Sequence, residues 1–295
     1  MNKRTLAILA ALGATTIYGL NHTIAKGVMP NYVGAFAFVM LRVIGATALF
    51  WIISLFGPKE KIDKKDYLRI LICAFFGMGV NMLVFFKGLS LSTPINSAVL
   101  ITTTPIIVLI LSALLIKEKI TQRKVFGIFI GLLGALGLIL FGAEIRQDAP
   151  NIGLGNFLIL MNSVFYGTYL ILAKILISKY HPFTFMKWLF LLGIFICLPF
   201  GYQEMTEIDW VNLPFDMIWR IAFVIIGTTF CTYLFNIYAL THLKASTLST
   251  FMYVQPLLGI LFAIAVGKDS LTTIKVLAAA MVMFGVYLSS KKTKV

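Results

Sequence analysis

Residues 18–26, with the sequence YGLNHTIAK, return as residues 166–174, YGTYLILAK, 148 positions further along the chain. Two prolines inside apolar stretches, Pro105 and Pro256, also stand at matched places. An acidic residue follows thirteen positions after each of these prolines. The sequence therefore predicts one structural unit that occurs twice.

The composition indicates a membrane protein. Hydrophobic residues make up 60% of the chain and charged residues only 12%, and the mean hydropathy is +0.95. Apolar stretches of about 20 residues, the length that crosses roughly 30 Å of hydrocarbon, recur throughout. They cover residues 5–25, 33–56, 67–86, 94–116, 124–142, 154–177, 183–202, 219–240, 246–266 and 274–289. We therefore predict an all-α membrane protein with ten transmembrane helices.

The number of helices in each unit sets how the two units are oriented. We place a first five-helix repeat in residues 1–145 and a second in residues 150–295. Because five is odd, the second repeat must enter the membrane from the opposite side, so the two repeats are inverted. Inverted repeats with broken helices near the midplane of the lipid bilayer are typical of secondary transporters.

The net charge is +14, and the basic residues are distributed unevenly between the two sides of the membrane in a way that indicates the topology. With the N-terminus in the cytoplasm, the inner segments carry 18 basic and four acidic residues, and the outer segments carry six basic and seven acidic residues. The positive-inside rule predicts this asymmetry for ten helices with cytoplasmic N- and C-termini. We therefore expect the basic residues to serve membrane topology, and we expect no nucleic-acid partner.

The polar residue that matters most within a predicted span is Arg42. A cation near the centre of a membrane helix costs roughly 2.5–3.5 kcal/mol on insertion scales, and no acidic residue lies deep in any predicted span to neutralise it. One interpretation is that Arg42 faces a cavity and attracts an anion such as a carboxylate. The other is structural: the guanidinium bonds to free backbone carbonyls and holds helices together.

His22 is the candidate for proton coupling, because transporters usually relay protons through acids or histidines within the membrane. Imidazole titrates near neutral pH, which would suit a proton-coupled drug or metabolite antiporter. Alternatively, His22 is a neutral hydrogen-bonding group beside Asn21 and Thr23. Facilitated transport or exchange without a coupling ion is equally consistent with the sequence.

Pro105 and Pro256 predict interruptions in the fourth and ninth spans. A proline cannot donate a backbone hydrogen bond, so each disrupts the bond to the carbonyl four residues earlier, on Ile101 and Met252. Such carbonyls are tolerated in a membrane where they face a cavity or where side chains satisfy them. We interpret both prolines as gating positions; the alternative is a simple kink.

Other polar side chains form stripes at helical spacing, such as Thr15 with Tyr18 and Thr228 with Thr232 and Asn236. They predict a midplane cavity lined by both repeats. The candidate substrate-binding residues are Asn21, His22, Arg42, Asn81, Thr102, Thr103, Tyr166, Tyr233, Asn236, Tyr253 and Gln255. We predict a secondary transporter that moves a small organic metabolite, such as an amino acid, by alternating access, in efflux or exchange.

Other classes of protein have weaker support. A membrane enzyme would need a catalytic constellation, but the three histidines are scattered and no acid pair lies within a span. A channel would need a continuous polar pore or a ring of charges. We therefore expect no catalytic residue, no metal site and no cofactor.

Glycines recur along the fifth span at Gly127, Gly131, Gly134 and Gly137. Small residues at this spacing form a close-packing surface between membrane helices. We expect the fifth and tenth spans to be peripheral. Pairing of two copies of the chain through this surface, as a homodimer, is left open.

The chain resembles the EamA group of the drug/metabolite transporter superfamily over its whole length. In the first half, the resemblance rests on Tyr18-Gly19 through Lys26, Arg42, Pro105, Lys117-Glu118-Lys119 and the glycine-rich fifth span. In the second half, it rests on Pro256, Lys268-Asp269, Leu271-Thr272 and Gly285, with Asp269 where the family more often has Glu. This resemblance implies a multi-pass carrier in the bacterial inner membrane, with its cavity between the repeats.

Overall fold

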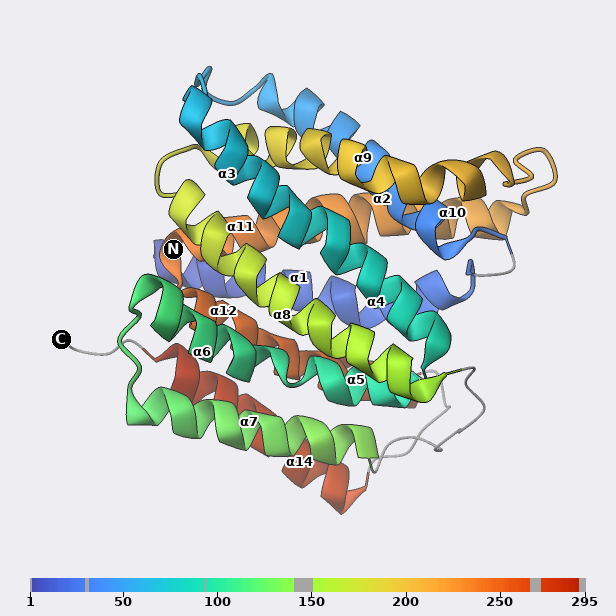
Figure 1. Ribbon diagram of the computed structural model, residues 1–295. Coiled ribbons are helices and arrows are strands. Elements are labelled where there is room, and N and C mark those ends of the chain that lie inside the picture. Colours follow the sequence, from blue (N-terminus) through green and yellow to red (C-terminus); the bar gives the residue numbers. More distant parts are fainter. Residues whose placement is uncertain (1, 30–31, 93, 141–150, 266–271, 292–295) are drawn as a thin grey trace.

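A long apolar chain in a membrane must satisfy its backbone hydrogen bonds within itself, and helices do so. In the computed structural model, which describes residues 2–29, 32–92, 94–140, 151–265 and 272–291, every regular element is a helix (Figure 1). The first half contains α1 (Lys3–Lys26), α2 (Ala35–Ser54), α3 (Lys64–Ala74), the π-helix η1 (Phe75–Gly79), α4 (Val80–Leu91), α5 (Pro94–Ile101), α6 (Thr104–Ile116) and α7 (Gln122–Leu140).

The second half contains the counterparts of these elements in the same order. They are α8 (Ile152–Leu176), α9 (Pro182–Thr206), α10 (Phe215–Phe223), the π-helix η2 (Val224–Cys231), α11 (Thr232–His242), α12 (Ala245–Thr250), the 3₁₀-helix η3 (Phe251–Tyr253), α13 (Val254–Ala265) and α14 (Thr273–Ser290).

Eight helical stretches in the described part of the chain are long and apolar enough to cross a membrane. Two further stretches are of similar length. Helix α1 has 24 residues, which at 1.5 Å per residue is about 36 Å, and α12, η3 and α13 follow one another without a loop. The helical, multi-pass architecture is therefore as predicted, whereas ten spans and cytoplasmic termini stay predictions.

The helices pack in matched pairs. Helix α4 packs against α8, and their counterparts α11 and α1 pack against each other in the same way. Similarly, α6 packs on α8 and α13 packs on α1. Counterpart helices also pack directly on each other, α2 on α9 and α7 on α14. In Figure 1, α1 and α8 run in opposite directions across the bundle. This arrangement is what two inverted copies of one unit produce.

Both halves contain a π-helix at a corresponding place, which the sequence analysis did not predict. The π-helix η1 joins α3 to α4, and η2 joins α10 to α11. A π turn has one more residue than an α turn, and such turns are often found at functional sites. Gly77 lies in η1, and a Cβ atom there would come within 2.4 Å of the Tyr169 ring of α8. The Tyr169 side chain, from the second half, therefore packs directly on the backbone of the first π-helix.

The two interruptions predicted at the prolines are present. Helix α5 ends at Ile101 and α6 begins at Thr104, one residue before Pro105. Between them, the amide of Thr103 donates to the carbonyl of Leu100, 3.0 Å away, in a tight i→i−3 turn. In the second half, α12 passes into η3 before Pro256. The fourth and ninth spans are thus broken at matched positions.

The glycine face of α7 packs on α14 of the same chain. A Cβ atom at Gly127 would lie 2.8 Å from the carbonyl oxygen of Gly285, and one at Gly134 would lie 2.7 Å from that of Ala278. The two backbones are therefore in direct contact, as expected for a close-packing surface. Both helices lie at one edge of the bundle (Figure 1). Because α14 occupies this face, we do not propose a homodimer through it.

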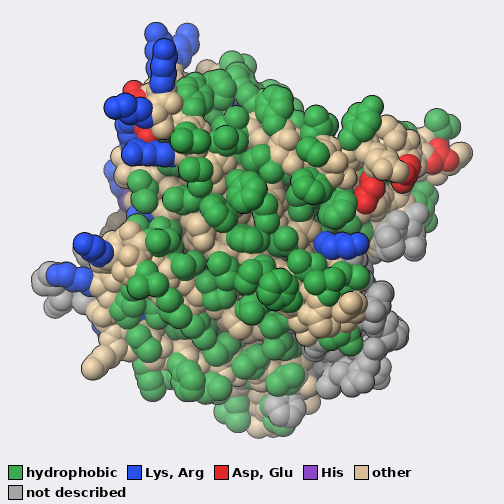
Figure 2. All heavy atoms as spheres, viewed as in Figure 1, with side chains coloured by type: hydrophobic (Ala, Val, Ile, Leu, Met, Phe, Trp, Pro, Cys, Tyr) green, Lys and Arg blue, Asp and Glu red, His purple; other side chains and the backbone are tan. Residues whose placement is uncertain are grey.

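The two ends of the bundle differ in charge (Figure 2). At one end, the loop between α2 and α3 exposes Lys59 and Lys61, and α3 begins with the exposed Lys64. At the other end, the loop between α9 and α10 exposes Glu207 and Asp209. Helix α1 begins and α14 ends at the basic end (Figure 1). The basic and acidic loops therefore lie at opposite ends of the bundle.

Candidate functional site

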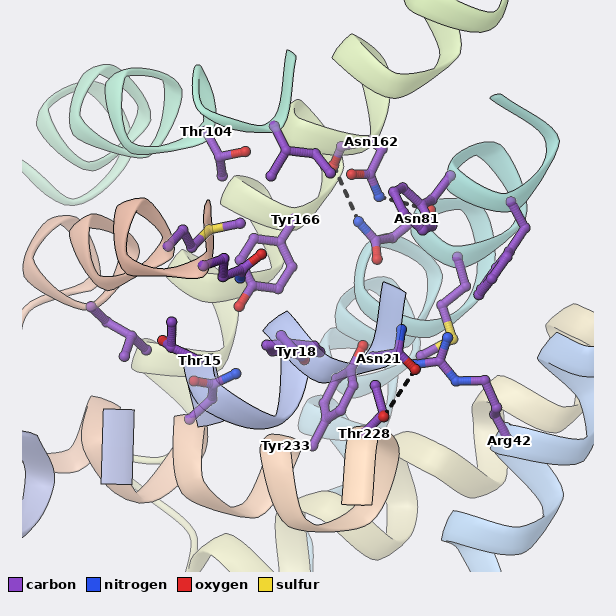
Figure 3. A pocket seen from close by; sticks show the side chains of 18 residues that line it. Thr15, Tyr18, Asn21, Arg42, Asn81, Thr104, Asn162, Tyr166, Thr228 and Tyr233 are labelled. Carbon is purple, nitrogen blue, oxygen red and sulfur yellow. Dashed lines mark hydrogen bonds between the residues drawn. The ribbon is translucent and has the colours of Figure 1, made fainter. Parts of the chain in front are cut away.

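A cavity lies between the two halves near the middle of the bundle (Figure 3). The centre of a water-sized molecule can move through about 120 Å³ of this cavity, which is room for several water molecules. Helices of both halves contribute to its wall. Its polar lining residues are Thr15, Tyr18, Asn21, Arg42, Asn81, Thr104, Asn162, Tyr166, Thr228, Tyr233, Asn236 and Gln255. Its apolar lining residues are Met82, Phe85, Phe86, Ile101, Leu248 and Met252.

Most of the candidate residues from the sequence meet at this cavity. Those that line it are Asn21, Arg42, Asn81, Tyr166, Tyr233, Asn236 and Gln255. The sequence placed them on several separate helices, and the fold brings them to one wall. The side chain of His22 lies outside the described residues, and so does Asp269. That the lining residues bind substrate stays a prediction.

Three candidate residues lie beside the cavity but do not line it. The hydroxyls of Thr102 and Thr103 donate to the backbone carbonyls of Val99 and Leu100 within the break of the fourth span. The ring of Tyr253 instead packs on α7, where it approaches the position of a Cβ on Gly131 to 2.6 Å. These three side chains are therefore not part of the cavity wall.

Some lining residues were missing from the candidate list. Thr15, Tyr18, Asn162 and Thr228 line the cavity, and so does Thr104 immediately before Pro105. Thr15, Tyr18 and Thr228 belong to the stripes that predicted the cavity, and Asn162 lies one helical turn before Tyr166, so the stripe pattern already contained these four residues.

The two carbonyls expected to be freed by the prolines belong to lining residues. Ile101 precedes the break before Pro105, and Met252 lies in η3 before Pro256. Non-helical backbone at membrane depth is tolerated where it lines a cavity. The matched breaks therefore contribute to the wall of the cavity from both halves.

Arg42 is the cation of this cavity. It is 6% exposed, and its Nε donates to the Thr229 hydroxyl oxygen at 2.9 Å. Its guanidinium lies 5.4 Å from the centre of the Phe86 ring, within range of a cation–π contact. Among the described residues, no carboxylate forms an ion pair with it. Figure 3 shows Arg42 at the opposite end of the cavity from Thr15 and Thr104.

Hydrogen bonds between polar lining residues fasten helices of opposite halves. The side-chain amide of Asn81 donates to the backbone carbonyl of Asn162 at 3.1 Å, and that of Asn162 donates to the carbonyl of Asn81 at 3.0 Å. This reciprocal pair joins α4 to α8. The hydroxyl of Thr228 donates to the side-chain oxygen of Asn21 at 3.0 Å, which joins η2 to α1.

Aromatic rings form another part of the wall. The rings of Tyr166 and Tyr169 lie 6.0 Å apart, and Tyr233 lies 6.0 Å from Tyr169. The hydroxyl of Tyr233 donates to the backbone carbonyl of Gly77 at 3.3 Å, inside η1. The tyrosine cluster therefore rests on the first π-helix, and it gives the cavity an apolar surface with polar tips.

The basic end of the bundle is fastened by a buried ion pair. Lys124 of α7 lies 2.9 Å from Glu118, and it also donates to the hydroxyl oxygen of Ser246 at 2.7 Å. Ser246, at the start of α12, donates in turn to Glu118. This group joins the end of the first half to the ninth span of the second half.

Among the described side chains, no three His, Cys, Asp or Glu residues are grouped to hold a metal ion. What the cavity offers instead is one cation, several amides and hydroxyls, and aromatic rings.

Comparisons with known proteins agree with this architecture. The profile of the EamA-like transporter family matches residues 5–140 and again residues 153–291. An uncharacterized transporter of Archaeoglobus fulgidus is 29% identical over 277 residues, which cover 94% of this chain and 96% of the relative. The uncharacterized transporter YetK of Bacillus subtilis is 24% identical over 297 residues, covering 100% of this chain and 89% of YetK. A crystal structure with 15% identity has the same fold, with a TM-score of 0.79 over 96% of both chains.

Proposed function

Because this chain belongs to the EamA-like transporter family and is a multi-pass membrane transporter, we propose that it carries a small carboxylate-bearing metabolite by alternating access. An amino acid is one such compound. The cavity between the halves is the substrate site, and Arg42 receives the carboxylate. Transport is in the direction of efflux or by exchange across the bacterial inner membrane.

The observation that carries this proposal is the environment of Arg42. A buried guanidinium in a membrane protein is costly unless a partner or water compensates it. Here the only hydrogen bond from it to a described residue uses Nε, and no described carboxylate neutralises it. The cavity wall that it belongs to has no acidic residue among its described members. An anionic group of the substrate would supply the missing charge.

The matched breaks support alternating access. The fourth and ninth spans are interrupted beside Pro105 and Pro256, and the third and eighth spans contain π-helices. In an inverted-repeat transporter, one half rocks against the other around a fixed midplane site. Bending at the prolines would close one side of the cavity as the other side opens.

We further propose that the chain crosses the membrane ten times. The eight long apolar stretches are eight of these spans, and α1 and the stretch from α12 to α13 are the other two. Both termini then lie in the cytoplasm.

A screen of binding tests the substrate class. Purified protein is heated with amino acids, other carboxylic acids, and the amides and amines that match them in shape. A ligand that binds the folded state raises the melting temperature. We expect carboxylates to stabilise the protein, and we expect Arg42→Ala to remove this effect.

Arg69→Ala is the control, because Arg69 is an exposed arginine that pairs with Asp66 at the basic end. Stabilisation by amines or amides alone, or carboxylate binding that Arg42→Ala leaves unchanged, would contradict the proposed substrate class.

A further inference from the structure

Thr229 is buried behind the cavity wall and contacts Arg42 directly. Its side chain is 0% exposed, and it is not itself a lining residue. Its hydroxyl oxygen accepts the hydrogen bond from the Arg42 Nε at 2.9 Å. The same hydroxyl donates to the backbone carbonyl of Val224 at 2.8 Å. Because its one proton is used on Val224, the lone pairs of the oxygen are left to accept from Arg42.

This orientation depends on the π-helix. Three buried threonines in α-helices of this chain, Thr15, Thr47 and Thr232, donate to the carbonyl four residues back. Thr229 lies in η2 and reaches Val224, five residues back. The wider turn thus supplies the acceptor that fixes the Thr229 hydroxyl, and Thr229 in turn fixes Arg42.

The contact decides which nitrogens of Arg42 remain for a ligand. A guanidinium has five N–H donors in a rigid plane. Nε is occupied by Thr229, and the plane rests near the Phe86 ring. The two terminal nitrogens are left, and these form the fork that binds a carboxylate with two parallel hydrogen bonds.

We propose that Thr229 is a positioning residue for substrate recognition, which holds Arg42 so that its terminal nitrogens receive the carboxylate. This inference rests on the proposed function of Arg42. The matched positions of the opposite halves do not repeat this pair: by the sequence correspondence, Phe190 of the second half stands in place of Arg42, and Met78 of the first half stands in place of Thr229. The ring of Phe190 packs on Tyr233, 5.2 Å away. Among the described residues, this arginine–threonine pair, which joins α2 of the first half to η2 of the second half, therefore occurs once.

The test compares binding of sodium benzoate with binding of benzamide, its uncharged isostere, by calorimetry on the purified full chain. The unsubstituted protein should prefer benzoate. Thr229→Val should weaken benzoate binding by roughly tenfold, the loss expected for one hydrogen bond to a charged group, and leave benzamide binding unchanged. Thr229→Ser keeps the hydroxyl and should keep the preference. Thr47→Val, a buried threonine on the helix of Arg42, is the matched control.

The outcomes separate the two proposals. Equal benzoate affinity in Thr229→Val and the unsubstituted protein would overturn the role of Thr229, while loss of the preference in Arg42→Gln would still support the role of Arg42. A benzoate preference that survives Arg42→Gln, or an unsubstituted protein without one, would contradict the proposed function itself.

A second measurement follows the contact without any ligand. The Nε–H signal of Arg42 can be recorded by NMR of protein labelled at arginine and identified by its loss in Arg42→Lys. Its proton should exchange slowly with water in the unsubstituted protein and in Thr229→Ser, and faster in Thr229→Val. Fast exchange in all three would overturn the inference even if Thr229→Val were too unstable for calorimetry.

Discussion

At the scale of single residues, the two halves differ at the cavity, and we propose that this difference sets the specificity for substrate. Arg42 has no basic counterpart, since Phe190 stands at the matched position. The cavity therefore has one charged end, and Thr15 and Thr104 lie at the other end (Figure 3). Two similar halves can rock between two states. A substrate whose two ends differ chemically, however, needs a site whose two ends also differ.

Arg42→Lys tests whether geometry matters at this end as well as charge. Lysine keeps the positive charge but offers a point charge instead of a planar fork. We expect carboxylate affinity to fall by roughly tenfold relative to the unsubstituted protein and to stay above that of Arg42→Ala. Calorimetric titration with benzoate measures this order, and a lysine variant that binds as tightly as arginine would argue against bidentate recognition.

The reciprocal asparagine pair should contribute to stability. Asn81→Ala and Asn162→Ala each remove one of the two bonds between α4 and α8. A net contribution of about 0.5–1.5 kcal/mol per bond is expected, seen as a lower melting temperature in detergent. Thr16→Ala is the control, because Thr16 is exposed and bonds within α1. Unchanged melting of both asparagine variants would show that water replaces the pair without loss.

The residue patterns predicted much of the cavity wall and missed its finer parts for a physical reason. Asn236 and Tyr233 were found because regular helical spacing places a stripe of residues on one face. Tyr253 was chosen from a similar stripe, but its ring packs on α7 and does not line the cavity. Thr229 was missed because the π-helix η2 changes which residues share a face of the helix. A pattern of three- and four-residue spacings does not predict the face on which a residue lies beyond such a turn.

At the scale of elements, the third and eighth spans depend on close contact at their π-helices. Gly77 lets the Tyr169 ring lie against the backbone of η1, and Tyr233 bonds to its carbonyl. The tyrosine cluster and the first π-helix are therefore one packing unit, built from both halves. A substitution in η1 should therefore alter the packing of Tyr169 and Tyr233 in the second half.

Gly77→Ala tests this unit. The added Cβ would lie 2.4 Å from a carbon of the Tyr169 ring, so the ring must move. We expect a loss of about 1–3 kcal/mol in stability, typical of an overpacked core, measured by thermal unfolding. Gly153→Ala is the matched control, because the nearest atom to its added Cβ is 3.9 Å away. Equal melting of the two variants would mean that the contact is loose.

The buried ion pair at the basic end makes a separate prediction. Glu118→Gln leaves Lys124, whose side chain is 9% exposed, without its counter-ion. Breaking a buried pair on one side costs about 3–5 kcal/mol, so the variant should unfold at a clearly lower temperature. Adding Lys124→Met to Glu118→Gln removes the unpaired charge and should restore much of the loss. A double variant as unstable as the single one would show that the charges are not what holds this end.

At the scale of the whole molecule, the doubled sequence predicted the architecture well. In Figure 1, α1 and α8 run in opposite directions, and the packing of α4 with α8 matches that of α11 with α1, as in two inverted copies of one unit. Five spans in each half stay a prediction. The packing of α7 on α14 through glycines was only half predicted: the close-packing face was expected, but the sequence did not identify its partner within the chain. Partner choice depends on the three-dimensional arrangement of both repeats, which local patterns do not contain.

Exchange flux across a membrane tests the central claim most directly. Proteoliposomes are loaded with the carboxylate that stabilises the protein most in the thermal screen, and uptake of the same labelled compound is followed. We predict saturable uptake that accelerates when the compound is present inside, and none above the level of empty liposomes for Arg42→Ala. Flux that does not saturate, or that Arg42→Ala carries at the unsubstituted rate, would contradict a carboxylate carrier that works by alternating access.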